Sequence, residues 1–165
     1  MHFGKSSDAL KKLAKLDPTI KTGIPEWLVQ FDACVGRSAV EHLLIPSHEM
    51  PDKADADFAK FANIAYSTHA EKKLVKDEIY PKWRAWYDNM CEEIANILTT
   101  YVDWRADPVL RRMMMTGGRD ASGHDVKPLR VTRRGELFYQ KLHELSTLSD
   151  GTTQESMTEE WSHIF

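Results

Sequence analysis

The chain has 165 residues, of which 42% are apolar and 28% charged, with 22 Lys and Arg against 25 Asp and Glu. A chain of this size buries one hydrophobic core without disulfide or metal staples, which excludes intrinsic disorder for most of it. No stretch approaches the about 20 apolar residues that cross a bilayer, and residues 1–5 open no secretory signal. We therefore expect an intracellular (cytoplasmic) protein with no membrane partner, in which Cys34 and Cys91 act as small apolar side chains.

Helical patterns dominate the first half of the chain. A first amphipathic helix is predicted from Ser6 or Ser7 to Leu16, since the residue before Pro18 is pushed out of the helical region. Its alternative interpretation is a membrane-surface or targeting helix. A second helix is predicted from Pro25 to Pro46, followed by a loop over residues 46–53.

A third helix is predicted to begin near Asp55 and to run to Ile79, with a break or kink at Pro81. After the proline, apolar residues recur at helical spacing from Trp83 to Tyr101. This aromatic stretch predicts the centre of the core, and a ligand-binding aromatic box is the alternative.

The next helix is predicted to start at Asp107, as N-cap, and to stop at Gly117. Its three consecutive methionines, 113–115, cannot all face one core, so at least one should point outward. A polar turn follows over residues 119–128, then a short strand over 129–131. Thr132 is predicted to cap the last helix, whose inward side chains are Leu137, Phe138, Leu142 and Leu145.

These elements predict a mainly α fold, a single-domain helical bundle that allows one small β-hairpin at about residues 116–131. Residues 1–150 form the domain, and residues 151–165 form a flexible or docking C-terminal tail. The apolar end of the tail either docks back or binds a partner, through Trp161, Ile164 and Phe165.

Motifs for metal, cofactor or nucleophilic chemistry are missing from the sequence. Its seven histidines are scattered along the chain. The residues that could meet in space as metal ligands are His42, His48, His69 and the neighbouring Glu49. No Gly-x-Ser-x-Gly, Walker or dinucleotide fingerprint occurs. We expect no metal, no cofactor, no catalytic residues and a non-enzymatic binding protein.

Charge is segregated along the chain. Residues 105–134 carry eight Arg and Lys against three Asp, whereas residues 135–165 carry one Lys against six acidic residues. Such a basic block predicts either a patch for phosphates and acidic partners or an electrostatic match between neighbouring segments.

One family resemblance falls on residues 109–145. Three features follow one another before an amphipathic helix: Val109-Leu110-Arg111-Arg112, an Arg119-Asp120 turn, and Leu129-Arg130-Val131-Thr132-Arg133-Arg134-Gly135. Their order resembles the wing and following helix of winged-helix transcriptional regulators of the multiple-antibiotic-resistance and phenolic-acid-regulator types. The resemblance implies DNA binding, with Arg119 at a wing tip in the minor groove or on phosphates. Residues 107–115 would then be the recognition helix, and the implied nucleic-acid contacts are Arg111, Arg112, Arg119, Arg130, Arg133 and Arg134.

Cations on a hairpin and a helix start gain affinity by displacing counterions from nucleic acid, DNA or RNA. We also expect Arg133 and Arg134 to be exposed, so that replacing both leaves thermal unfolding nearly unchanged. The alternative function is a structural or adaptor subunit of a larger assembly, of the viral or mobile-element coat, scaffold or inhibitor type. Five Trp and seven Met suit burial against a protein partner or self-association.

Overall fold

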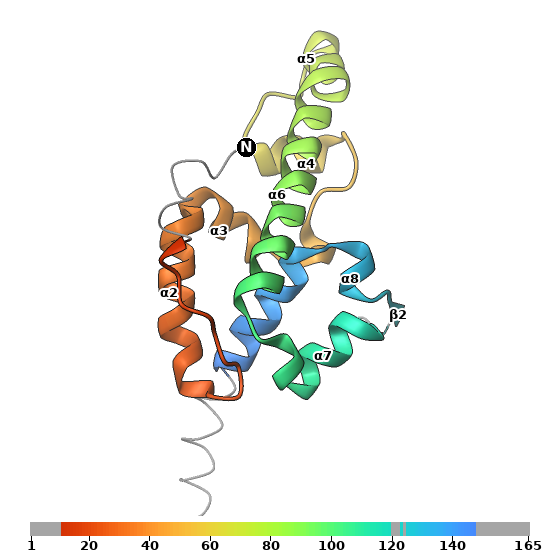
Figure 1. Cartoon of the computed structure of the whole chain (residues 1–165). Helices are drawn as coiled ribbons and strands as arrows, with labels where there is room; N and C mark the ends of the chain where they lie inside the picture. Colours follow the sequence, from red (N-terminus) through yellow and green to blue (C-terminus); the bar gives the residue numbers. More distant parts are fainter. Residues whose placement is uncertain (1–10, 120–122, 124, 148–165) are drawn as a thin grey trace, which may run out of the picture.

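The computed structural model describes residues 11–119, 123 and 125–147, and it confirms a mainly α-helical single domain (Figure 1). The α-helices are α2 (Ile24–Val35), α3 (Arg37–Leu43), α4 (Ala56–Ala62), α5 (His69–Leu74), α6 (Tyr80–Tyr101), α7 (Pro108–Met115), α8 (Leu129–Thr132) and a helix over residues 135–147. Short 3₁₀ turns occur at Lys21–Gly23, Ser47–Glu49 and Trp104–Ala106. The strands β1 (Gly118–Arg119) and β2 (Asp125–Val126) pair antiparallel, inside the segment predicted to form a hairpin.

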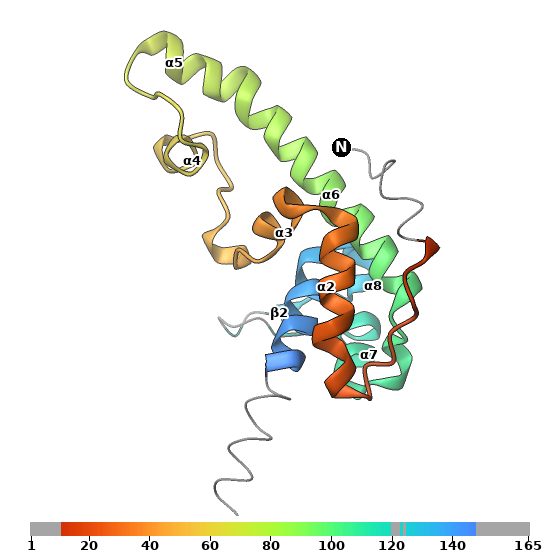
Figure 2. The same ribbon diagram turned by 90° about the vertical axis from the view of Figure 1, so that its left-hand side faces the viewer.

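One long helical rod, formed by α5, a π-helical turn (Val75–Ile79) and α6, is the longest continuous element of the domain (Figure 2). The sequence predicts a break or kink at Pro81, but the chain stays helical through this residue. Proline is tolerated here because it stands in the first turn of α6, directly after the π-helical turn. This one rod therefore contributes side chains to both ends of the domain.

The hydrophobic core is built on the buried face of α6 between Tyr87 and Leu98, as the aromatic stretch predicts. Buried residues of α6 pack with α2 and with helix 135–147, and these residues include Phe31, Tyr87, Met90, Cys91, Ile94, Leu98, Phe138, Tyr139 and Leu142. Cys34 and Cys91 are free and buried, as expected for small apolar side chains.

Two predicted helices are shorter than expected. The second ends at Val35, because Gly36 adopts φ +93, and α3 then starts as a separate helix. The third begins where predicted, with the Asp55 carboxylate accepting a hydrogen bond from the Phe58 amide at 3.1 Å. It ends at Asn63, which adopts the left-handed conformation at φ +56.

The first predicted helix does not extend to Leu16, as the described part of this segment shows. Residues 13–15 have no regular secondary structure, and Leu16 forms a parallel bridge with Val102 instead of continuing a helix. The Leu16 amide donates to the Tyr101 carbonyl at 2.7 Å, and the Leu16 carbonyl accepts from the Asp103 amide at 2.9 Å. Tertiary pairing with the end of α6 thus replaces the local helical pattern. The predicted start, at residues 6–10, lies outside the described residues.

Two predictions beyond the hairpin are wrong. Residues 129–131 form a helical turn, α8, rather than a strand, because Pro128 leads into it and its carbonyl accepts from the amides of Val131 and Thr132. Thr132 lies inside this turn and caps nothing; its hydroxyl is buried without a hydrogen-bond partner. Arg133, in the left-handed conformation at φ +57, separates α8 from helix 135–147.

No helix among the described residues is long and apolar enough to cross a membrane. The predicted C-terminal tail, with Trp161, Ile164 and Phe165, lies outside the described residues.

Candidate nucleic-acid interface

The basic segment folds into three consecutive elements: α7, the β1–β2 hairpin and α8. We call this part of the molecule, residues 107–134, the basic lobe. It occupies the lower right of Figure 1, where α7 and α8 pack on each other. Tertiary structure therefore gathers the basic segment on one side of the core.

The orientation of α7 is set by Asp107. Its side chain accepts a hydrogen bond from the Leu110 amide at 2.9 Å, confirming the predicted N-cap, and it also binds Lys21 Nζ at 2.8 Å. Burial raises the pKa of Asp107, but the hydrogen bonds from Lys21 and from the Leu110 amide outweigh burial and leave the pKa below its usual value. Because Lys21 neutralises it, this acid does not offset the arginines on the outer side of α7.

The outer side of α7 is basic and partly apolar. Leu110 and Met114 are buried, which leaves Arg111 and Arg112 exposed to solvent. Met115 is 44% exposed, which confirms that at least one methionine of the run points outward. A broad depression of about 600 Å³ follows this side, lined by Pro108, Val109, Arg111, Arg112, Met115 and Thr116.

The rest of the lobe adds further cations. Lys127 and Arg130 are exposed, and neither forms an ion pair among the described residues. Arg119 pairs through its backbone with Asp125 across the hairpin. The side chain of Arg119 lies outside the part of the chain that the structure describes, so its predicted place at a wing tip stays a prediction.

Arg134 belongs to the packing of the domain as much as to its surface. Its Nε donates to Glu136 Oε1 at 2.7 Å, and its Nη2 donates to Ser47 Oγ at 3.1 Å. The Arg134 side chain is 43% exposed, whereas that of Glu136 is 4% exposed. Arg133 is half-buried. The expectation that both arginines are exposed is therefore wrong for Arg133, and Arg134 is exposed but holds a buried carboxylate.

A polar cleft of about 550 Å³, not anticipated from the sequence, lies behind this ion pair. Two of its polar atoms, Glu136 Oε2 and Thr132 Oγ1, are buried without a hydrogen-bond partner. Burial, and then the neighbouring Glu136 charge, raise the pKa of the Cys91 thiol, which favours its protonated form. The cleft mixes both charges, and its lining comprises Ser47, Met50, Asp52, Arg84, Tyr87, Asp88, Cys91, Glu92, Thr132, Arg133, Arg134 and Glu136.

In the sequence, Gly135 is the signal that helix 135–147 packs closely against α6. A Cβ at this position would lie 2.4 Å from the Cys91 carbonyl oxygen and 2.4 Å from the Ala95 amide nitrogen. Glycine therefore lets the start of helix 135–147 touch α6, which brings Glu136 inside.

A second buried polar group joins α2 to helix 135–147. The Tyr139 hydroxyl donates to Asp32 Oδ1 at 2.7 Å, and the His143 ring packs edge-on against Tyr139 with centroids 4.6 Å apart. Burial raises the pKa of Asp32 and lowers that of His143, although the two side chains attract each other. This cluster explains how an acidic residue of α2 is held, partly buried, at the edge of the core.

The histidines considered as metal ligands lie apart. His42 packs among aromatic rings, with its Nδ1 2.8 Å from the Ser38 carbonyl oxygen, whereas His48 and His69 are exposed. Within residues 11–119, 123 and 125–147, no group of three or more His, Cys, Asp or Glu side chains is arranged to hold a metal ion.

Comparison of the chain with protein-family models, with curated proteins and with solved structures gives no match. The fold defines the protein as a mainly α-helical domain. Any functional conclusion therefore depends on the side chains of the domain itself.

Proposed function

We propose that this chain is a nucleic-acid-binding protein that contacts phosphates through the basic lobe. The observation that carries the proposal is the exposure of Arg111, Arg112, Lys127 and Arg130 on neighbouring elements, with no ion-pair partner among the described residues. Asp107, a buried acid of the lobe, is neutralised by Lys21 from outside it. Exposed, unpaired arginines and lysines are the groups that displace counterions from a nucleic acid.

Duplex DNA is the ligand that this geometry favours. A helix is about 10–12 Å in diameter and fits a major groove that is about 12 Å wide. In such a complex α7 enters the groove with Arg111 and Arg112, and the hairpin and α8 lie along the phosphates. The order of α7 and hairpin also follows the winged-helix resemblance of the sequence, although α8 stands where the resemblance implies a returning strand.

The expected affinity is modest. The whole chain carries a formal charge of −3, so attraction depends on the local excess of cations in the lobe. Four phosphate contacts predict that log K falls with log salt at a slope of about −3.6, and sequence-independent binding has a Kd of about 10⁻⁴–10⁻⁶ M at physiological salt.

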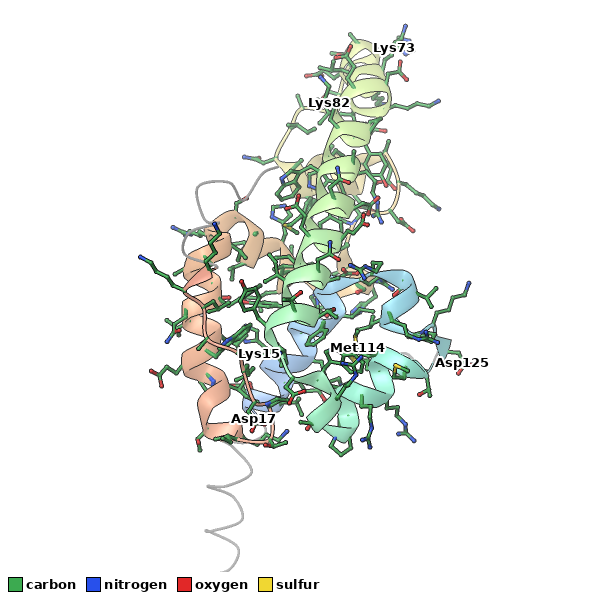
Figure 3. The ribbon with its side chains drawn as sticks, in the orientation of Figure 1. Lys15, Asp17, Lys73, Lys82, Met114 and Asp125 are labelled. Carbon is green, nitrogen blue, oxygen red and sulfur yellow. The ribbon has the colours of Figure 1, made fainter. Side chains whose placement is uncertain are left out.

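A fluorescence-anisotropy titration across a salt series tests the proposal, with duplex DNA and single-stranded RNA as ligands. Replacing Arg111 and Arg112 by Gln should weaken binding to both and reduce the salt slope by about 2. The matched control replaces Lys73 and Lys76 by Gln; both are exposed, and Lys73 lies at the opposite end of the molecule (Figure 3). Equal loss in both variants, or no binding at low salt, contradicts the proposal.

A second candidate function, a subunit of a larger assembly, is favoured by apolar side chains on the same lobe. Val109 is 45% exposed and lines the same depression as the exposed Met115, and Val131 of α8 is 63% exposed. Exposed apolar groups next to arginines suit a protein contact. Sedimentation velocity separates the two functions: a DNA regulator should be a monomer or two-fold dimer, whereas an assembly subunit should form larger oligomers that Val131→Ser weakens.

A further inference from the structure

A groove of about 270 Å³ runs between the basic lobe and helix 135–147. One wall is the 46–48 segment, and the opposite wall is the base of the hairpin. Helix 135–147 forms the remaining side. The lining residues are Pro46, Ser47, His48, Met113, Gly117, Gly118, Val126, Leu129, Arg134, Leu137, Gln140, Lys141 and Glu144.

The groove is preformed by hydrogen bonds. Gln140 Nε2 donates to the carbonyl oxygens of Leu43 at 2.8 Å and Ile45 at 2.9 Å, and Arg134 Nη2 donates to Ser47 Oγ at 3.1 Å. These contacts tie the 46–48 wall to helix 135–147. An occupant therefore does not have to create the cavity.

The interior is apolar and the rim is charged. Met113, Val126 and Leu137 are half-buried and line the groove. On the rim, Lys141 Nζ binds Glu144 Oε2 at 2.9 Å, and Arg134 supplies a second cation. Clefts for drug-sized ligands measure about 300–1,000 Å³, so this volume suits a few side chains of a peptide.

The chain itself contains a segment of matching chemistry. Residues 148–165 have no Lys or Arg and four acidic residues, and their apolar residues gather near the end. The acidic residues are Asp150, Glu155, Glu159 and Glu160, and the apolar ones near the end are Met157, Trp161, Ile164 and Phe165. The rim cations Arg134 and Lys141 are already paired with Glu136 and Glu144, so the match depends on the aromatic residues in the apolar groove and on the acidic residues beside the cations of the basic lobe that form no ion pair among the described residues.

The segment is also within reach. It begins directly after Thr147, and Glu144, at one end of the groove, lies only three residues earlier on the same helix. The wall from Leu137 to Glu144 is about 10 Å long at the helical rise per residue. Residues 148–160 span up to about 40 Å when extended, which exceeds the distance needed to turn back.

We infer that residues 148–165 dock in this groove of their own chain, with Trp161, Ile164 and Phe165 inside it and the acidic residues toward Arg134 and Lys141. This inference goes beyond the proposed function and does not depend on it.

The test uses a fluorescently labelled peptide of residues 148–165 and the full-length chain. In one variant, called the open variant, Trp161, Ile164 and Phe165 are replaced by Ala, which empties the groove. A segment tethered near its site competes at an effective concentration of about 1 mM, so a peptide with a Kd of about 100 µM should bind the wild type about tenfold more weakly than the open variant.

Substitutions in the groove locate the binding. In the open variant, Lys141→Glu should weaken peptide binding several-fold, and Met113→Gln should weaken it further. Lys73→Glu is a matched charge reversal in α5, at the end of the molecule opposite the basic lobe, and it should leave binding unchanged. Circular dichroism of each variant checks that the fold is retained, and Lys141→Glu serves where Met113→Gln unfolds.

Three outcomes overturn the inference. The first is no binding to the open variant, and the second is binding that Lys141→Glu and Lys73→Glu affect equally. The third is a concentration-dependent dimer of the wild type that the open variant abolishes, since the groove would then hold the segment of a second copy. Binding of the peptide is measured without nucleic acid, so failure of the proposed function does not alter this result.

Discussion

Arg134 and Glu136 form an ion pair in which the cation is partly exposed and the carboxylate almost completely buried, with Nε and Oε1 2.7 Å apart. The pair joins the basic lobe to the core, because Arg134 also donates to Ser47 and Glu136 lies against α6. One residue of the basic segment therefore stabilises the domain, whereas Arg111, Arg112, Lys127 and Arg130 of the same segment are exposed.

Removing this cation should destabilise the protein. Arg134→Gln leaves the Glu136 carboxylate buried without its partner, and we expect the free energy of unfolding to fall by about 1–3 kcal/mol, less than for a fully buried pair because water reaches Arg134. Urea unfolding followed by circular dichroism measures the change. Arg130→Gln, at an exposed residue that forms no ion pair within the described part of the chain, should change stability by less than about 0.5 kcal/mol.

This prediction replaces the sequence-based expectation that Arg133 and Arg134 can be changed without affecting unfolding. The double variant Arg134→Gln with Glu136→Gln should recover part of the lost stability, since no buried charge remains. A stability equal to that of the wild type in Arg134→Gln alone would show that the pair contributes nothing.

Asp107 should make stability depend on acid pH. Its pKa in the folded protein is lowered, so the unfolded chain binds more protons and stability rises with pH through this range. The contribution is complete above the unfolded pKa of about 3.9 and is lost as the pH falls through the lower folded value. Asp107→Asn keeps an oxygen for the Leu110 amide but loses the attraction to Lys21.

Thermal unfolding between pH 6 and acid pH, about 2.5, checks this prediction. The Asn variant should be less stable than the wild type at pH 6, and the difference should shrink at the acid end. The control Asp57→Asn removes an exposed acid of α4 with no ion pair among the described residues. A difference that stays constant with pH would contradict the assigned charge interaction.

Gly135 should not tolerate a methyl group. An added Cβ meets two backbone atoms of α6 at 2.4 Å, and neither can move without distorting the helix. We expect Gly135→Ala to lower the free energy of unfolding by about 2–3 kcal/mol, as for an overpacked core. Gly118→Ala is the matched control, since a Cβ there meets no atom within 4 Å. Equal stability of both variants in urea would contradict the close packing.

The acidic segment should compete with nucleic acid. If it docks beside the basic lobe, Glu159→Gln with Glu160→Gln should raise the affinity for duplex DNA several-fold at low salt; this prediction depends on both proposals. The control Asp77→Asn with Glu78→Gln removes two exposed acids far from the lobe. Anisotropy titrations compare them, and an equal rise in both would mean that only net charge matters.

Local signals predicted several elements correctly. Asp107 was identified as a helix N-cap, and a helix start was placed near Asp55, because a short acidic side chain satisfies amides only three residues away. The apolar face of α6 was predicted because its period of about 3.6 residues extends over about five turns, from Trp83 to Tyr101. Thr132 has the same chemistry as a cap, yet Pro128 starts a helical turn before it and Arg133 ends that turn.

What the sequence by itself determined is the helical class, the positions of the strongest caps, the buried face of α6 and the segregation of charge into a basic block and an acidic end. These properties depend on neighbours within a turn or two, so they can be calculated from spacing alone. Tertiary structure decided which cations are free: Asp107 is neutralised by Lys21, 86 residues away, and Arg134 is held by a carboxylate that the close approach at Gly135 buries. It also formed the groove, whose walls come from residues 46–48 and from the distant residues 113–144, because contacts between such parts arise only when the core assembles.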